Sequence, residues 1–266
     1  GYKGIKTCVS PMKDFNDKHI VVTGGVNGIG LGAVEVFVRE GAKVSILDID
    51  QAGTKLEEES GGKITFLKCN VADAKSVEES IAKAIRKFGE VDVLVNNAGI
   101  NRYATVTETT EVEWDLVMNV NLKSAFLAAK YAIPSMQKKG SGVVVNISSV
   151  QAFVSQSQVA AYTTSKTAML GLTRSIAVDY GPAIRCVTVC PGSVNTPMLQ
   201  KAINESPNPE EVFRECEDMH LVKKVGDPKE VGEFIAFLAS SKASFMTGQA
   251  YRIDGGLGVS IGGSKQ

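Results

Sequence analysis

The chain has no long apolar run and no excess of either charge. Its 266 residues include 29 lysines and arginines against 29 aspartates and glutamates, so the formal net charge is zero. Because the sequence contains no basic stripe, we do not expect a nucleic-acid partner. No apolar run approaches the roughly 20 residues that a membrane-spanning helix requires, and residues 1–17 are too polar and charged for the apolar part of a signal peptide. The composition therefore argues against nucleic acids and membranes as partners.

Cysteine is also scarce, and its pattern argues against a disulfide scaffold. The chain has five cysteines, an odd number without the spacing of a disulfide framework: Cys8, Cys69, Cys186, Cys190 and Cys216. Cys186 and Cys190 lie on one face of an apolar, strand-like run with no histidine cluster nearby, so we expect buried thiols and no metal site. Reduced cysteines are typical of cytoplasmic proteins, and we expect a cytoplasmic location.

What the chain does contain is a repeated alternation of strand-like and helix-like segments. Apolar runs indicate strands at 19–23, 43–48, 64–69, 91–95, 143–149, 184–190 and 250–253, and helices are indicated at 31–40, 76–88, 111–136, about 162–180 and 228–240. This alternation predicts an α/β fold with one doubly wound parallel sheet of Rossmann type and helices on both faces. We expect a leader at 1–18, a dinucleotide-binding and catalytic domain at 19–256 with a substrate lid at about 197–224, and a tail at 257–266.

Tyr162 and Lys166 form the chemical motif around which the other candidate residues are arranged. Residues four apart on a helix share one face. A nearby ammonium group favours the phenolate form of a tyrosine, whose ordinary pKa is about 10, so Tyr162 could exchange a proton with a substrate. Ser149 ends the apolar run before this helix, and the three side chains could therefore meet at the carboxyl edge of the sheet. The alternatives are a half-buried aromatic beside a solvated lysine, and a serine that only caps a strand end.

A glycine-rich turn follows the first predicted strand, where a dinucleotide-binding turn would lie. Residues 24–30 carry four glycines between that strand and the first predicted helix. Glycines there let the backbone approach a pyrophosphate, which the helix N-terminus also attracts. Asp48 ends the second strand, where a carboxylate can accept hydrogen bonds from the adenosine ribose and repel a 2′-phosphate. We therefore expect NAD as the cofactor, with NADP less favoured, and we interpret Asp50 as a solvated loop residue.

Taken in order, these motifs resemble those of the short-chain dehydrogenase/reductase family. The resemblance covers residues 18–256, and it rests on the T-G-x-x-x-G-x-G turn at 23–30, N-N-A-G at 96–99, Asn121, Ser149, Y-x-x-x-K at 162–166, and the P-G segment at 191–192 with Thr196. One departure is Asn70, because many members carry aspartate near the adenine. An asparagine can still donate or accept a hydrogen bond there.

The resemblance implies a role for each matching residue. The implied catalytic residues are Asn121, Ser149, Tyr162 and Lys166, and the implied substrate contacts are Ser149, Gln151 and Tyr162. The implied cofactor contacts are Gly24, Asn27, Gly28, Ile29, Gly30, Asp48, Asn70, Val71, Asn97, Gly99, Tyr162, Lys166, Pro191, Gly192, Val194 and Thr196. Other interpretations stay open: Asn121 could interrupt its helix, Asn97 could satisfy local backbone groups, and Gln151 could be a plain surface residue. We interpret His220 and Trp114 as structural or solvent-facing residues and not as ligands.

Within the family, the segments at 149–152, 165–166 and 185–191 are similar to those of aldohexose dehydrogenases. This weaker resemblance implies an NAD-dependent enzyme that oxidises an aldose sugar, a small-molecule substrate. Two alternatives are a carbonyl reductase for an oxoacyl thioester, steroid or small ketone, and a non-catalytic nucleotide-binding protein. Family members are commonly dimers or tetramers, so we expect a homo-oligomer, with a tetramer favoured.

Overall fold

Within residues 14–259, the part of the chain that the computed structural model describes, seven parallel strands form one sheet in the order β3-β2-β1-β4-β5-β6-β7. The strands are β1 (His19–Thr23), β2 (Lys43–Asp48), β3 (Ile64–Lys68), β4 (Val93–Asn96), β5 (Gly142–Ile147), β6 (Ile184–Pro191) and β7 (Ala250–Ile253). The predicted doubly wound parallel sheet is confirmed. The chain reverses its direction of strand addition between β3 and β4, so β1 and β4 flank the crevice where such sheets bind ligands.

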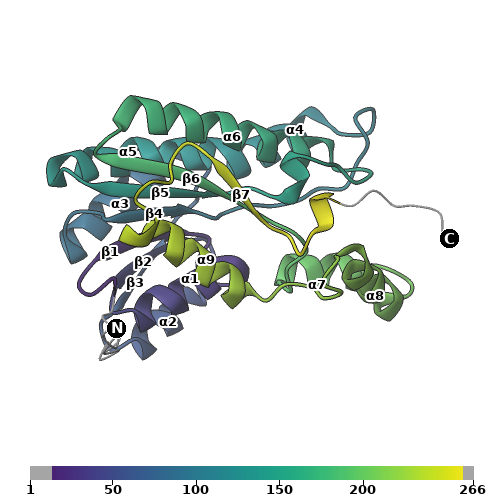
Figure 1. Cartoon of the computed structure of the whole chain (residues 1–266), viewed down its shortest axis with the longest axis horizontal. Helices are drawn as coiled ribbons and strands as arrows, with labels where there is room; N and C mark the ends of the chain where they lie inside the picture. The colour runs from purple at the N-terminus through teal and green to yellow at the C-terminus, as the bar shows by residue number, and fades with distance from the viewer. Residues whose placement is uncertain (1–13, 260–266) are drawn as a thin grey trace, which may run out of the picture.

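Helices cover both faces of this sheet (Figure 1). They are α1 (Gly28–Arg39), α2 (Gly53–Glu59), α3 (Ala74–Phe88), α4 (Glu111–Met118), α5 (Ser124–Lys139), α6 (Ala160–Tyr180), α7 (Pro197–Asn204), α8 (Pro209–Met219) and α9 (Pro228–Ala239). Alternate residues of each strand point to opposite faces. On β1, Ile20 and Val22 pack in the core with α1 and α9, whereas Val21 packs in the core with α3, α5 and α6. Both strand faces are therefore apolar, as buried parallel strands require.

The long helix predicted over 111–136 is wrong as a single element. A π-helical turn, η1 (Asn119–Lys123), separates α4 from α5. Three further differences are smaller. α1 begins at Gly28, inside the glycine-rich turn, α2 was not predicted, and the strand predicted to reach residue 149 ends at Ile147. The other predicted elements are present, with ends that shift by a few residues.

The two ends of the chain were predicted to be a leader and a tail. Residues 1–13 and 260–266 lie outside the described residues. Phe15 is buried and its ring packs edge to face on Phe37, with 4.9 Å between the ring centroids, so the end of the predicted leader contacts α1. None of the helices within residues 14–259 is both long and apolar enough to cross a membrane.

Candidate functional site

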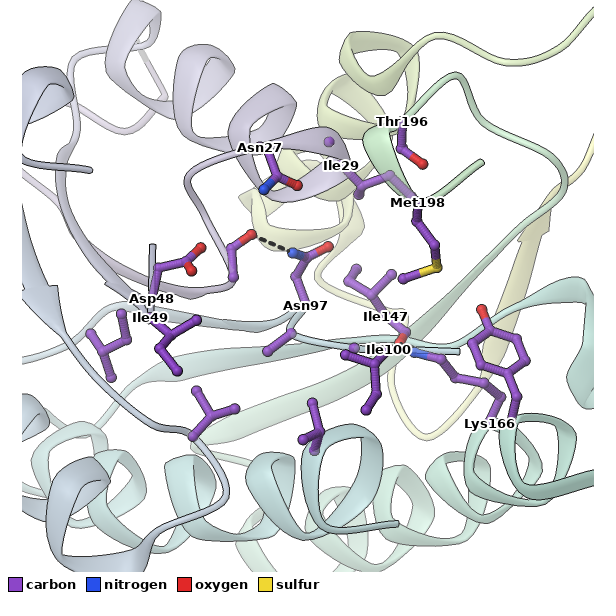
Figure 2. A pocket seen from close by; sticks show the side chains of 18 of the residues that line it. Asn27, Ile29, Asp48, Ile49, Asn97, Ile100, Ile147, Lys166, Thr196 and Met198 are labelled. Atoms are coloured by element: carbon purple, nitrogen blue, oxygen red, sulfur yellow. Dashed lines mark hydrogen bonds between the residues drawn. The ribbon is translucent and has the colours of Figure 1, made fainter. Parts of the chain in front are cut away.

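A cavity of about 520 Å³ lies at the carboxyl ends of the central strands. Residues at or just after the ends of β1, β2, β4 and β5 line it, namely Gly24, Asp48, Asn97 and Ser148. Figure 2 shows Asp48 and Ile49 on one side of this cavity, Lys166 on the opposite side, and Thr196 and Met198 along a third edge. The sequence-derived motifs therefore converge on one cavity.

The glycine-rich turn packs against the N-N-A-G segment. The amide of Asn97 donates hydrogen bonds to the backbone oxygens of Gly24, at 2.8 Å, and Thr23, at 3.2 Å. Gly24 has a φ of +65°, and a Cβ at Gly30 would overlap the Gly24 carbonyl oxygen. Side chains at these two positions would therefore disrupt the turn. Gly30 lies beneath the turn and does not line the cavity, and Asn97 has a structural role while it also lines the cavity.

The start of α1 fits the pyrophosphate of a dinucleotide. Asn27 is the N-cap residue, yet its side chain caps no backbone N–H of the helix. The first-turn N–H groups and the positive end of the helix dipole are consequently left for an anion. Gly28 has a φ of +55°, and a Cβ at this position would come within 3.2 Å of the Thr196 side chain. The residues present therefore fit a dinucleotide, which this chain would hold between α1 and the carboxyl ends of β2 and β4.

Asp48 is held rigidly at the other end of the cavity. One carboxylate oxygen accepts the Val26 N–H at 3.1 Å, and the other accepts the Asp50 N–H at 3.0 Å. Each oxygen keeps a further lone pair that a ribose hydroxyl could use. Asp50 is exposed and accepts the Ala52 N–H at 2.9 Å. Of the two aspartates, only Asp48 lines the cavity, as the sequence interpretation expected.

Tyr162 and Lys166 lie one turn apart on α6, and both line the cavity. The Lys166 Nζ lies 5.6 Å from the centroid of the Tyr162 ring and donates a hydrogen bond to the Ile147 carbonyl at 3.0 Å. Burial lowers the pKa of Lys166 to about 8. Burial also raises the pKa of Tyr162, and the Ser149 side chain partly opposes this rise. Desolvation of the phenolate is the largest cause of the rise, and the expectation that Lys166 favours the phenolate stays a prediction.

Asn121 is fully buried in the π-helical turn and does not line the cavity. Its side chain brackets the backbone of Ile100, accepting the N–H at 2.8 Å and donating to the carbonyl at 2.9 Å. The amide also donates to the Ser165 hydroxyl at 3.1 Å. The extra residue of a π turn re-aims a side chain, and here the side chain joins the loop after β4 to α6. Asn121 is therefore a link between cavity walls, and its implied catalytic role stays a prediction.

Ser149 and Gln151 lie beside the tyrosine outside the lined cavity. The Ser149 side chain is buried and caps a short 3₁₀ turn, η2 (Val150–Ala152), where its oxygen accepts the Gln151 N–H at 3.1 Å. The Gln151 amide donates to Gln156 at 3.2 Å and accepts from the Thr163 hydroxyl at 3.3 Å. Ser149 therefore caps the 3₁₀ turn and not the strand end that one alternative proposed, and its side chain also acts on Tyr162.

The structure places most of the implied cofactor contacts on the cavity. The following line it: Gly24, Asn27, Gly28, Ile29, Asp48, Asn70, Val71, Asn97, Gly99, Tyr162, Lys166 and Thr196. Pro191, Gly192 and Val194 do not line it. Gly192 packs so closely on His220 that a Cβ would come within 2.8 Å of the ring Nε2. Val194 is buried and pairs with Gly226. These three residues shape the loop that leads to Thr196.

Sequence reasoning missed several cavity residues. They are Leu47, Ile49, Cys69, Ala98, Ile100, Arg102, Leu116, Val120, Ile147, Ser148 and Met198. Ile49, Ala98 and Met198 are neighbours of recognised motifs, and this adjacency could have identified them. Leu116 and Val120 belong to α4 and the π-helical turn, and no local pattern distinguishes them from ordinary helix-packing residues.

Comparison with known proteins identifies the family. A family model described as enoyl-(acyl carrier protein) reductase matches residues 24–258. An uncharacterized oxidoreductase of Thermotoga maritima is 41% identical over 248 residues, which make up 91% of this chain and 98% of that protein. The chain belongs to the short-chain dehydrogenase/reductase family. As a short-chain dehydrogenase/reductase, it is an oxidoreductase that acts on CH–OH or carbonyl groups with a nicotinamide cofactor.

Two solved structures resemble this short-chain dehydrogenase/reductase over nearly its whole length. The ligand-free aldohexose dehydrogenase of Thermoplasma acidophilum has a TM-score of 0.89 and 39% identity, and the match covers 96% of this chain and 99% of that one. Levodione reductase has a TM-score of 0.88 and 30% identity, with coverage of 93% and 100%. The predicted resemblance to aldohexose dehydrogenases is confirmed as a similarity of the whole chain.

Proposed function

We propose that this enzyme is an NAD-dependent dehydrogenase that oxidises an aldose at its anomeric carbon. The likeness to an aldohexose dehydrogenase at 39% identity carries the choice of substrate. The polar side chains of Gln151, Gln156 and Thr163, joined beside Ser149, support it because hydroxyl and amide groups suit a sugar. Asp48, fixed by two backbone N–H groups, supports NAD over NADP because its charge repels a 2′-phosphate.

The protein residues act by positioning and by moving one proton. In this proposal Ser149 orients the substrate hydroxyl, and Tyr162 accepts its proton as the general base. Lys166 stays charged near neutral pH because its pKa is about 8, and it supplies the positive charge beside the tyrosine. When bound, the oxidised nicotinamide supplies the hydride acceptor. Asn121 keeps the loop after β4 and α6 at a fixed separation through its bonds to Ile100 and Ser165.

Reduction of a small ketone is the second candidate. The similarity to levodione reductase and the apolar cavity residues Leu116, Val120 and Met198 favour it. A less polar substrate would pack on such residues without losing hydrogen bonds. The two candidates differ in direction and in the polarity of the substrate, and one assay can separate them.

The assay follows reduced-nicotinamide absorbance with NAD⁺ and, separately, NADP⁺ over a panel of aldoses, polyols, hydroxysteroids and secondary alcohols. In the reducing direction it follows the loss of the same absorbance with NADH or NADPH and small ketones. We expect turnover of an aldose with NAD⁺. Tyr162→Phe should lower kcat by about 10² to 10⁴ while NADH still binds, and Tyr180→Phe, at the far end of the same helix, should leave kcat unchanged. Activity only with NADP⁺ would contradict the role of Asp48. Activity only on ketones with reduced nucleotide would favour the second candidate.

A further inference from the structure

His220 is a buried polar side chain with two hydrogen bonds and no contact with the main cavity. Its Nε2 lies 3.1 Å from the Ser193 backbone nitrogen, and its Nδ1 lies 2.6 Å from the Cys216 carbonyl oxygen. A backbone N–H can only donate, so Nε2 accepts. The proton of the neutral ring therefore lies on Nδ1, which donates to Cys216. One tautomer satisfies both neighbours.

The bond from Ser193 joins the start of the segment that carries α7 and α8 to its end, and the bond to Cys216 fixes the ring on the end of α8. Ser193 lies just after β6, before α7 begins, and His220 lies just after α8 ends. Figure 1 shows α7 and α8 beyond the carboxyl edge of the sheet. A parallel bridge between Val194 and Gly226 lies beside this closure, with the Gly226 N–H bonded to the Ser193 carbonyl at 2.9 Å. His220 therefore supplies the side-chain part of a closure at the base of α7–α8.

The ring fits tightly and faces a small cavity of about 200 Å³. A Cβ at Gly192 would lie 2.8 Å from Nε2, and a Cβ at Gly255 would lie 3.3 Å from the His220 Cβ. The charged groups that line this cavity have other partners. Lys224 pairs with Glu230 at 2.5 Å, and Asp254 accepts the N–H groups of Gly256 and Gly258. The position of the ring is therefore set by its bonds to Ser193 and Cys216.

This closure controls residues that line the dinucleotide cavity. Thr196 lies three positions after Ser193, caps α7 by accepting the Leu199 N–H at 3.3 Å, and lines the cavity with Met198. We propose that His220 is a positioning residue for the nucleotide site, because it holds the two ends of the α7–α8 segment together and so keeps Thr196 and Met198 against the cavity. The inference rests on the nicotinamide-dependent activity of the family and is independent of the aldose proposal.

Two variants of His220 separate positioning from packing. A glutamine at 220 can place its oxygen where Nε2 lies and accept the Ser193 N–H, whereas an asparagine can place its amide where Nδ1 lies and donate to Cys216 only. His220→Asn should raise the Kd for NADH about three- to tenfold, the effect of one lost hydrogen bond. kcat at saturating nucleotide should change less than about twofold. His220→Gln should restore binding. NADPH replaces NADH if it binds the wild type more tightly.

Hydrogen exchange gives a readout that needs no substrate. In the nucleotide-free protein, the Ser193 amide should exchange faster in His220→Asn than in the wild type, and His220→Gln should restore protection. The proposal would be overturned if both variants bound NADH as tightly as the wild type, or if both lost the same amount of affinity. If His220→Asn does not fold, hydrogen exchange of the wild type with and without NADH tests the proposal. Because coupling is reciprocal, NADH must slow exchange at Ser193, and an unchanged rate would overturn the proposal.

Discussion

Lys166 carries a buried ammonium group that enters no ion pair among residues 14–259. Its main polar contact is the hydrogen bond to the Ile147 carbonyl, and burial lowers its pKa from 10.5 to about 8. A charge held in this way opposes folding, since the unfolded chain would leave it in water. In the proposed function this charge lies beside Tyr162, and a loss of stability of this kind is expected at a functional site.

The stability of the protein should therefore depend on pH through Lys166. The pKa of Lys166 is lower in the folded protein than in the unfolded chain, so the unfolded chain binds more protons between about pH 8 and pH 10.5. The contribution of Lys166 therefore increases the free energy of unfolding as the pH rises through this range. The full penalty, about 3 kcal/mol, is present below pH 8. In urea denaturation without nucleotide, Lys166→Met should have a larger free energy of unfolding than the wild type below pH 8. The difference should shrink by about 3 kcal/mol between about pH 8 and pH 10.5. Lys83→Met, at an exposed position, is the control, and a pH-independent advantage for Lys166→Met would contradict the prediction.

Single residues also divide into those that sequence can locate and those that it cannot. Tyr162, Lys166 and Asp48 were found because helix spacing and strand ends fix where such side chains point. The raised pKa of Tyr162 was not predicted, because desolvation depends on what covers the ring and not on its neighbours in sequence. The buried bonds of Asn121 to Ile100 likewise come from a contact between segments that local patterns do not reveal.

Among the elements, α1 and α9 pack at a crossing made by two glycines. A Cβ at Gly232 of α9 would lie 2.5 Å from the Gly32 carbonyl oxygen, and a Cβ at Gly32 of α1 would overlap the Pro228 carbonyl. Backbone atoms in two packed helices cannot shift easily. This contact lets α9 lie against the same face of the sheet as α1.

Gly232→Ala should accordingly destabilise the protein by about 3 kcal/mol through overpacking. Gly171→Ala is the matched control, since Gly171 is also helical and its Cβ would meet nothing within 4 Å. Alanine is the better helix former, so this variant should gain about 0.5–1 kcal/mol. Urea denaturation of both variants tests the pair. If both variants changed the free energy of unfolding by similar amounts of the same sign, the helix crossing would not be as tight as the backbone geometry indicates.

Element types were predicted more reliably than element breaks. The segments with clear periodicity were recovered, and β2 and β7 have the predicted ends. The division of residues 111–136 was missed because helical propensity continues through the π-helical turn, which tertiary bonds from Asn121 stabilise. α2 was missed because it spans only seven residues, and only Gly53 of these is buried. Such short, mostly exposed helices have little amphipathic signal.

For the whole molecule, alternation along the chain predicted a parallel sheet but left the order of its strands open. In the structure, β2 and β3 lie on one side of β1, and β4 to β7 lie on the other. This order places the crevice between β1 and β4. Motifs that lie at strand ends in the sequence converge there. Residues contributed by α4 and the segment after Thr196 could not be assigned in advance, because their position depends on how whole elements pack above the sheet edge.

Apolar side chains remain exposed on the face formed by α4, α5 and α6. Phe126 is 48% exposed and Val112 is 78% exposed. An open groove of about 420 Å³ on this face is lined mainly by apolar residues of α4, the π-helical turn, α5 and α6: Met118, Leu122, Phe126, Ala168 and Leu172. An exposed apolar face of this kind is typical of protein interfaces. We propose that copies of this chain associate through it, and that a homotetramer forms.

Light scattering of the purified protein should then give a mass of four chains of 28.3 kDa each. Phe126→Glu should shift the mass to a smaller species, because association would bury the introduced charge without a partner. Val106→Glu adds the same charge at a residue that is 77% exposed before α4, away from this groove, and should leave the mass unchanged. A wild-type mass equal to one chain would contradict the assembly. A tetramer that survives Phe126→Glu would mean that its contacts involve a different face.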